Sequence, residues 1–487
     1  MIRDTSPEVV MSKAARGKID PLTFNAEQDL IDGTRFKRLE LPLQALQSPL
    51  LASPDSALVR RWMAIAVAMT AFMNGTMASV AVPVAVDFLQ YESDDMLDKL
   101  KYGSLFACSP LVAVLFLVPA MWLAQLDRQY GGLSMLTVTF VCWTGSSLAS
   151  ACASLVQGGQ RLGVMLLART VNGLASSSGS MAVVNAVGTA TNDENQRLSM
   201  LLMTVVLFEA GQVFGMLLSG LATLSGVVRG WQITFCITAS LAAVGAGVVS
   251  LARHELGKYS IDTRPFLPNL AALVRILKTP LAIILSLAYF LVIASSVQTA
   301  IISPLWIRGF APTTIAAVTA VLLSTRNILF LFVLLMRCFA QPSGTVRRWR
   351  ALVFSTLLLS VAFVVFTIMD STTSHVSAIV LPLSIVGFAS GEVEINLFSV
   401  LASILNDRGS SHFGELRFLQ VFLLLISYFI APLFAVSMTS LVSFDWLFYI
   451  TALLLALFTP FIAVLKSYEE RVLAEHDHTS DNIASDG

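Results

Sequence analysis

Residues 280–306 read PLAIILSLAYFLVIASSVQTAIISPLW and contain no charged side chain. A helix of about 20 apolar residues crosses the ~30 Å hydrocarbon core of a bilayer, so this stretch is long enough to span it. Similar apolar runs elsewhere bring the number of predicted spans to twelve. The spans are 62–89, 103–126, 133–156, 162–190, 198–225, 231–252, 280–306, 313–338, 350–369, 376–405, 416–442 and 444–466. Their length favours helices, because the strands of a membrane barrel alternate over about ten residues.

The composition of the whole chain agrees with this interpretation. Of its 487 residues, 56% are hydrophobic and only 13% are charged, against about 25% charged in soluble domains. Of the 62 charges, 17 lie in residues 1–61 and 7 in 467–487, which leaves 38 for the 405 residues between them. So few charges cannot cover a water-exposed surface. The sequence therefore predicts an all-α integral membrane protein.

The same counts exclude several classes of function. With 31 basic and 31 acidic residues there is no net charge to hold nucleic acid. The five cysteines have no zinc-ligand spacing, and no nucleotide-binding loop of the Gly-x-x-x-x-Gly-Lys type occurs. No histidine cluster or Ser/His/Asp set lies within the predicted spans. We therefore expect a protein that is not an enzyme and that has no metal, other cofactor or nucleotide.

Basic residues beside the spans predict the orientation, because Lys and Arg are enriched in cytoplasmic connections. With the N-terminus inside, 17 of these residues fall on the cytoplasmic side and 5 outside. Arg417, at the start of the eleventh span, is one of the 17. The outer five are Lys99, Lys101, Arg161, Arg229 and Arg308. We expect a multi-pass protein of the cell (inner or plasma) membrane, in contact with the lipid bilayer and with both termini in the cytoplasm.

The longest internal connection divides the spans into six plus six. The predicted parts are a cytoplasmic polar tail (1–57), an N-terminal six-helix half (58–252), a cytoplasmic connection (253–279), a C-terminal six-helix half (280–466) and a cytoplasmic acidic tail (467–487). Residues 74–83 and 295–304 each place a small polar residue nine positions before a proline. This weak similarity favours two parallel repeats, as in transporters with two six-helix halves.

Short motifs in the first half carry a family resemblance. They are Asn74, Thr76, Val80, Ala81 and Pro83 in the first span, Asp127-Arg128 after the second, Arg169-x-x-x-Gly173 in the fourth, Gly211, Gly215 and Gly220 in the fifth, and Gly230-Trp231 at the sixth. In this order, with twelve spans, they resemble the major facilitator superfamily, most closely its drug:proton antiporter branches. Asn74 stands where that pattern has aspartate. The resemblance implies a secondary transporter in which Asp127 and Arg128 help to latch the two halves.

Ionisable groups inside hydrocarbon cost roughly 3 kcal/mol or more, so they face a cavity or form pairs. Five lie well inside the predicted spans, namely Arg169, Glu209, Arg326, Glu392 and Glu394. Spans four and five are neighbours in sequence, so we expect an Arg169–Glu209 pair. Arg326 and Glu392 lie at a similar predicted depth and form the second expected pair. The alternative for each of the five residues is a purely structural pair or a long side chain that reaches toward the membrane surface.

Glu392 and Glu394 are two residues apart, about 200° around a helix, so both cannot face one cavity. One turn from Glu392 is Asn396, whereas one turn from Glu394 is Ser390. A serine hydroxyl can bond to its own helix, whereas an amide must find partners outside it. This difference narrowly favours Glu392 as the cavity-facing acid and proton carrier, with Glu394 protonated on the far face.

Small residues mark a second feature of the fifth span. Gly211 and Gly215 lie one turn apart and form a face that lets another helix approach closely. Plain helix packing and a role in conformational coupling are both consistent with this face. Glu209 is expected to point away from it.

These observations favour a secondary transporter that exports a small amphipathic or drug-like compound in exchange for protons by alternating access. The predicted pathway residues are Glu392, Glu209, Arg326, Arg169, Glu394 and Asn74. One alternative is proton-coupled uptake of an organic anion clamped by Arg169 and Arg326. Another is a non-transporting scaffold or sensor with the same fold.

Overall fold

Long helices make up almost all of the described chain. This computed structural model describes residues 54–92, 99–127, 133–157, 160–190, 194–224, 229–256, 270–307, 315–339, 345–372, 376–406 and 413–485. No strand occurs among these residues. The predicted all-α class is therefore confirmed.

The helices follow the predicted spans closely. They are α3 (Pro54–Ser79), α4 (Ala81–Glu92), α5 (Lys99–Leu126), α6 (Leu133–Cys152), α7 (Gln160–Ala190), α8 (Glu194–Leu224), α9 (Gly230–Leu256), α10 (Leu270–Leu277), α11 (Pro280–Ile307), α12 (Ile315–Phe339), α13 (Thr345–Thr372), α14 (Val380–Asn406), α15 (Phe413–Leu441) and α16 (Phe444–Ser485). Two short 3₁₀ helices, Ala153–Leu155 and Val376–Ile379, extend α6 and precede α14.

Within the described residues, 11 helical stretches are long and apolar enough to cross a membrane. They match every predicted span except the fourth, 162–190, which corresponds to α7. At 31 residues, α7 is about 46 Å long and therefore long enough to cross. Its lower hydropathy comes from polar residues such as Arg169, Asn172 and Asn185, which are buried between helices.

The first predicted span is interrupted at Val80, between α3 and α4. The cause is Pro83, which has no N–H to donate to the carbonyl of Ser79. The flanking hydrogen bonds survive, because Val80 N donates to Thr76 O at 3.0 Å and Val84 N donates to Val80 O at 3.3 Å. The interruption is therefore confined to this one residue, and α3 and α4 together form the first span.

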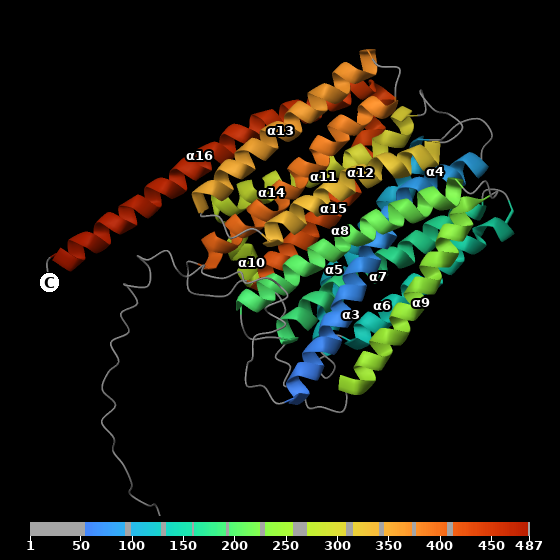
Figure 1. Cartoon of the computed structure of the whole chain (residues 1–487), viewed down its shortest axis with the longest axis horizontal. Coiled ribbons are helices and arrows are strands. Elements are labelled where there is room, and N and C mark those ends of the chain that lie inside the picture. The colour runs from blue at the N-terminus through green and yellow to red at the C-terminus, as the bar shows by residue number, and fades with distance from the viewer. Residues whose placement is uncertain are drawn as a thin grey trace, which may run out of the picture. The chain divides into compact units, whose positions relative to one another are not determined.

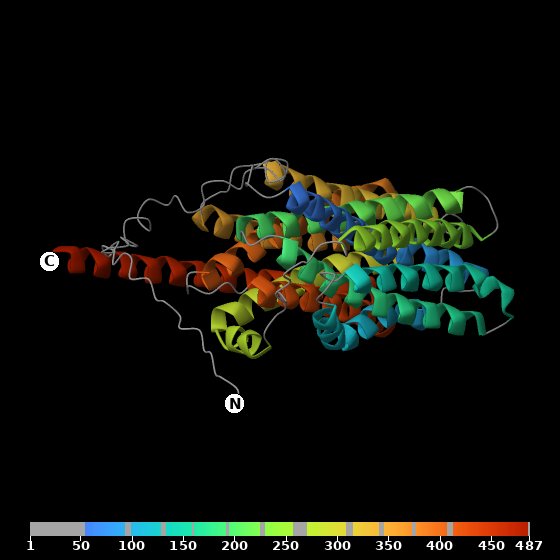
Figure 2. The ribbon, with the colours of Figure 1, turned by 90° about the horizontal axis from the view of Figure 1, so that it is seen from below.

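The connection and the tails differ from the helix bundle. In the connection predicted at 253–279, α10 buries Leu273 and Ile276 and leaves Arg275 exposed. The predicted boundary at residue 466 does not end a helix, because α16 continues to Ser485 and extends past its neighbours (Figures 1 and 2). Most of the predicted N-terminal tail, residues 1–53, lies outside the described residues.

Helix packing joins the helices before residue 256 to those after residue 270 (Figure 1). Within the first group, α3 packs on α8, α5 on α7 and α6 on α9. Within the second group, α11 packs on α15, α12 on α14 and α13 on α16. The most extensive contacts between the groups are those of α8 with α12 and of α5 with α15. We call the groups the first and second helix groups; their assignment as two repeated halves stays a prediction.

The outward faces of the long helices are apolar, whereas much of the polar content is buried. Leu115, Leu221 and Val464 are more than 60% exposed. Such faces suit contact with lipid, which offers no hydrogen-bond partners. The buried polar side chains must therefore satisfy one another or face an internal cavity.

Candidate functional site

A central cavity lies between the two helix groups. Its lining comes from α3, α4, α5, α7 and α8 on one side and from α11, α12, α14 and α15 on the other. The centre of a water-sized sphere can move through about 150 Å³ of this cavity. A single water needs roughly 10–15 Å³ by the same measure. The cavity therefore has room for a small organic molecule or a cluster of waters.

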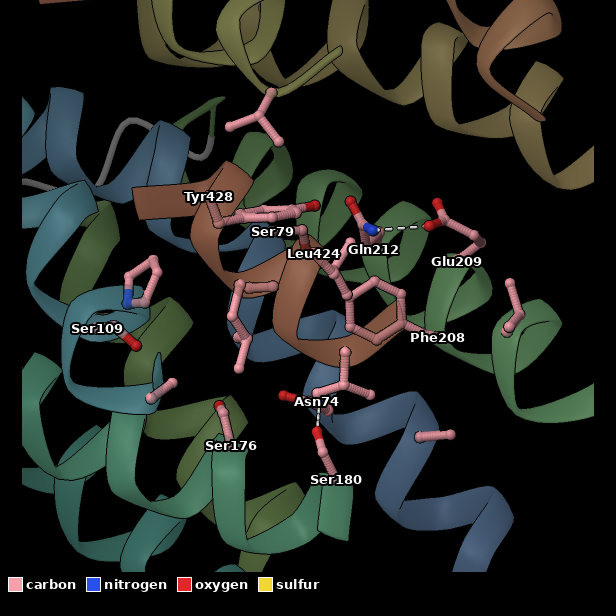
Figure 3. Close-up of a pocket in the computed structure, with 18 of the residues that line it drawn as sticks. Asn74, Ser79, Ser109, Ser176, Ser180, Phe208, Glu209, Gln212, Leu424 and Tyr428 are labelled. Atoms are coloured by element: carbon pink, nitrogen blue, oxygen red, sulfur yellow. Dashed lines mark hydrogen bonds between the residues drawn. The ribbon is translucent and has the colours of Figure 1, made fainter. Parts of the chain in front are cut away.

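Most of the predicted pathway residues line this cavity. They are Asn74, Arg169, Glu209, Arg326 and Glu394. Figure 3 shows Glu209 bonded to Gln212 on one side of the view, with Ser109 on the other. Asn74 lies between them and donates from Nδ2 to Ser180 Oγ at 3.5 Å. The predicted transport roles of these residues stay predictions.

The prediction that Glu392 faces the cavity and Glu394 points away from it was wrong. Glu394 lines the cavity, whereas Glu392 is not among the lining residues. Asn396 does not reach outside its helix, because its Nδ2 donates to Glu392 O at 2.7 Å and to Glu392 Oε2 at 3.0 Å. The buried hydroxyl of Ser390, in contrast, has no hydrogen-bond partner within the described structure. Both assumptions behind the choice of Glu392 therefore fail.

The expected Arg169–Glu209 pair does not form between these described side chains. Glu209 Oε1 accepts a hydrogen bond from Gln212 Nε2 at 2.9 Å, and its electrostatic neighbours are Glu394 and Arg326. The reason lies in the packing. Although α7 and α8 are neighbours in sequence, α7 packs mainly on α5 and α6, and α8 packs mainly on α3 and α12.

Arg326 is held by neutral groups and not by Glu392, its expected partner. Its Nε and Nη2 donate to Asn327 Oδ1 at 2.9 and 2.6 Å, and its Nη1 donates to Ser296 O at 2.6 Å. Helix α14 approaches the backbone of Arg326 through Gly387, where a Cβ would lie 2.2 Å from Arg326 O. Glu392 lies about 140° around the helix from that glycine, so its side chain points elsewhere.

Glu394 is surrounded by residues that the sequence analysis missed. Its Oε1 accepts hydrogen bonds from Tyr289 Oη at 3.2 Å and from Gln420 Nε2 at 3.3 Å. Arg417 is an electrostatic neighbour of Glu394 and donates from Nη1 to Gln420 Oε1. Its Nη2 donates to Thr204 Oγ1 at 3.3 Å, which links the two helix groups. Arg417 therefore belongs to the cavity wall and not only to a basic connection.

A pattern in α15 could have found these residues. Arg417, Gln420, Leu424 and Tyr428 recur every three or four residues, and all four line the cavity. This spacing places them on one face of a helix. Figure 3 shows Tyr428 and Leu424 beside Gln212 and Phe208 of α8.

Arg169 has a different environment from the other cavity arginines. It is 8% exposed, and its buried Nε has no hydrogen-bond partner among the described residues. Its ionisable neighbour is Cys108, whose Sγ lies 3.3 Å from Thr170 Oγ1. One turn along α7, Asn172 donates to Ser109 Oγ at 3.3 Å while its Oδ1 is unpartnered.

The glycine face of α8 permits the close helix contact that the sequence predicts. A Cβ on Gly211 would lie 2.0 Å from Phe72 O, and one on Gly215 would lie 2.1 Å from Ser79 Oγ. The partner helix is α3, and Thr76 Oγ1 adds a hydrogen bond to Gly211 O at 3.2 Å. These glycines therefore hold α3 against α8 within the first helix group, and a coupling role stays a prediction.

The predicted latch after the second span is described only in part. Asp127 Oδ2 accepts a hydrogen bond from Met135 N at 2.9 Å, which satisfies an N–H in the first turn of α6. Arg128 lies outside the described residues. Among the residues that the structure describes, no group of three or more His, Cys, Asp or Glu side chains could hold a metal ion.

Comparisons with known proteins agree with this architecture. The crystal structure of nucleoside transporter NupG is similar, with a TM-score of 0.56 and 14% sequence identity over 83% of this chain and 98% of that chain. At this identity the similarity concerns the fold alone. The comparison with curated proteins found no match. The sequence profile of the Major Facilitator Superfamily matches residues 64–413. The chain therefore belongs to the Major Facilitator Superfamily of secondary transporters.

Proposed function

We propose that the chain is a proton-coupled carrier that exports a small amphipathic compound through the central cavity by alternating access. The observation that carries this proposal is the position of Glu209 and Glu394. They come from different helix groups, line one cavity and interact electrostatically. Two buried carboxyl groups repel each other when both are ionised, so they can share one proton. A proton can therefore be exchanged where the two groups meet.

The apolar part of the lining supports an amphipathic substrate. Phe208, Leu424 and Val421 line the cavity beside the polar side chains. Substrate sites combine apolar walls with a few polar groups that fix orientation. The exchange of substrate for protons rests on the motif set of the first six spans, which resembles that of drug:proton antiporters.

Transport by carboxyl variants in proteoliposomes tests the proposal. A ligand is first found by thermal stabilisation of the purified protein, and its movement is then followed under an imposed pH gradient. Wild-type protein should drive it against the proton flow. Glu394→Gln should abolish this uphill movement, because the amide cannot release a proton, yet keep substrate exchange.

Glu392→Gln is the matched control, since this acid lies on the same helix but outside the cavity lining. It should transport with a normal pH dependence. Normal uphill transport by Glu394→Gln with loss in Glu392→Gln would exclude the proposed proton site. Movement of the ligand with the protons would indicate uptake in place of export. A non-transporting scaffold would show no ligand-dependent change in cavity accessibility.

We further propose that both termini face the cytoplasm of a cell membrane. The excess of basic residues in the connections assigned to that side supports this orientation. A cysteine introduced at Ser93, in a background without native cysteines, should react with an impermeant reagent only from outside. A cysteine at exposed Lys278 should react only from the cytoplasmic side. The reverse pattern would invert the topology.

A further inference from the structure

Three polar side chains along one stretch of α7 each have a polar atom for which the described residues supply no hydrogen-bond partner. Arg169, Asn172 and Ser176 are spaced by three and four residues, so they lie on one helix face, and all line the cavity. Arg169 and Asn172 are only 8% and 3% exposed, and Arg169 Nε and Asn172 Oδ1 are buried without a partner. The structure describes no hydrogen bond for the Ser176 hydroxyl.

Of the three arginines that line the cavity, Arg169 is the one that has neither a hydrogen bond nor a carboxylate neighbour among the described residues. Arg326 gives all of its nitrogens to Asn327 and Ser296. Arg417 leaves Nε unpartnered, but it bonds through both Nη groups and lies near Glu394. A buried charge without a partner is unfavourable, so membrane proteins keep one where it serves a ligand or pathway.

The acids of the cavity lie away from this stretch. Figure 3 shows Ser109 and Ser176 on one side of the pocket and Glu209 on the other. Glu209 and Glu394 interact with each other and with Arg326 or Arg417, whereas the ionisable neighbour of Arg169 is the Cys108 thiol. A negative group bound at Arg169 would therefore not face the carboxylates of the proton site.

Asn172 fits such a role as well as Arg169 does. Its Nδ2 now donates to Ser109 Oγ at 3.3 Å. A half-turn of the amide would aim Nδ2 at the cavity while Oδ1 accepts from the Ser109 hydroxyl. Arg169 and Asn172 lie one turn apart on the same face of α7, so the two side chains would then offer donors for the two oxygens of one carboxylate.

We propose that the Arg169 site, formed by Arg169, Asn172, Ser176 and Ser109, binds the carboxylate of an amphipathic organic acid. The apolar part of the acid lies against Phe106 and Pro110, which line the cavity on α5. This inference rests on the proposed transport function and names the substrate class of the same cavity.

Paired acids and amides test the inference by binding. The probes are phenylacetate and cinnamate, each compared with its neutral carboxamide, and the readouts are thermal stabilisation and titrated affinity of the purified full-length protein. Both acids should stabilise the wild type, and each amide should bind about tenfold or more weakly. Arg169→Gln should remove this preference for the acid, and Arg169→Lys should retain part of it.

Arg161→Gln is the matched control, because it removes a positive charge from the same helix outside the cavity lining. It should bind the acids as the wild type does. Arg169 makes no hydrogen bond with the described residues, so Arg169→Gln should remain folded and monodisperse, which size exclusion checks. Equal binding of acid and amide, or an acid preference that survives in Arg169→Gln, would overturn the inference.

The carboxylate site and the proposed transport function can fail independently, and the two failures give different results. Acid binding that depends on Arg169, with no movement of the acid under a pH gradient, would contradict proton coupling and leave the site standing. Proton-driven transport of a neutral compound that is unchanged in Arg169→Gln, with no acid preference, would contradict only the carboxylate site.

Discussion

The two helix groups bury an arginine against the same cavity but surround it differently. In the second group, Arg326 Nη1 also lies 3.4 Å from Ser296 Oγ, so neutral oxygens surround its guanidinium. In the first group, Arg169 makes no hydrogen bond with the described residues, and Asn172, one turn along α7, leaves its Oδ1 without a partner there. A guanidinium fully bonded to the protein has little capacity left for a ligand. The difference suggests that Arg326 is part of the framework and that Arg169 is available to substrate.

A second contrast concerns how the helices cross. In the first group α3 meets α8 through Gly75 and Gly211, where an added Cβ would lie 1.9 Å from Phe208 O and 2.0 Å from Phe72 O. In the second group α11 meets α15 through a side chain, since Ser427 Oγ donates to Phe290 O at 3.3 Å. The first crossing is a backbone contact and the second is a side-chain contact. Changes in size should therefore affect the first much more.

The largest expected effect comes from adding bulk at the glycine crossing. Gly211→Leu would place a side chain where Phe72 O now lies, so α3 and α8 must separate. A backbone cannot yield as a side chain can, so the cost exceeds the ~1–3 kcal/mol of ordinary overpacking. We expect complete loss of transport with membrane insertion retained, measured in proteoliposomes and by membrane fractionation. Gly215→Leu should behave in the same way.

Two variants control for this result. Gly145→Leu adds the same bulk where nothing lies within 4 Å of the new Cβ, so transport should persist. Ser427→Ala removes one crossing contact and should cost about 1 kcal/mol. Full activity of Gly211→Leu would show that the two crossings do not differ.

The contrast between the arginines predicts unequal effects on stability. Arg326→Met leaves Asn327 Oδ1 and Ser296 O without their charged donor and leaves Glu209 without its cationic neighbour, so it should cost about 3–5 kcal/mol. Arg169→Met removes a buried charge that has no partner, so it should be neutral or stabilising. Thermal unfolding in detergent measures both. Equal destabilisation by the two variants would remove the distinction between framework and substrate arginine.

Much of the fold follows from apolar length alone. Runs of more than twenty apolar residues must be helical in a bilayer, because helix formation satisfies every internal N–H and C=O group. Hydrocarbon also excludes charged side chains, so Arg169, Glu209 and Arg326 can be predicted from the sequence to face a cavity. What these side chains contact depends on helix packing, and the sequence does not contain that information directly.

The wrong predictions concern which helices pack together and where side chains point. The Arg169–Glu209 pair assumed that helices adjacent in sequence pack together, whereas α7 and α8 pack mainly on other helices. The choice of Glu392 assumed that Asn396 reaches outward, whereas it bonds within its own helix. Arg417 lies four residues after the start of α15, so its position in the chain alone suggests the membrane surface.

The smallest expected effect tests the contact between the two helix groups. Tyr102 of α5 is fully buried, and its Oη donates to Ile301 O of α11 at 3.1 Å. Tyr102→Phe removes this hydrogen bond and keeps the ring, which should cost about 1 kcal/mol, or roughly a fivefold shift in population. This bond lies near the start of α5 and the end of α11, which are predicted to face the outside. Alternating access requires the two helices to separate there, so the variant should favour the separated state. A cysteine at cavity-lining Ala113 should then react about fivefold faster with an impermeant maleimide applied from the outside.

Tyr449→Phe, at a side chain that is 50% exposed, should leave the rate of this reaction unchanged. An unchanged rate in Tyr102→Phe would mean that the two groups are held together elsewhere, by the packing of α8 on α12 and of α5 on α15, and not by this bond.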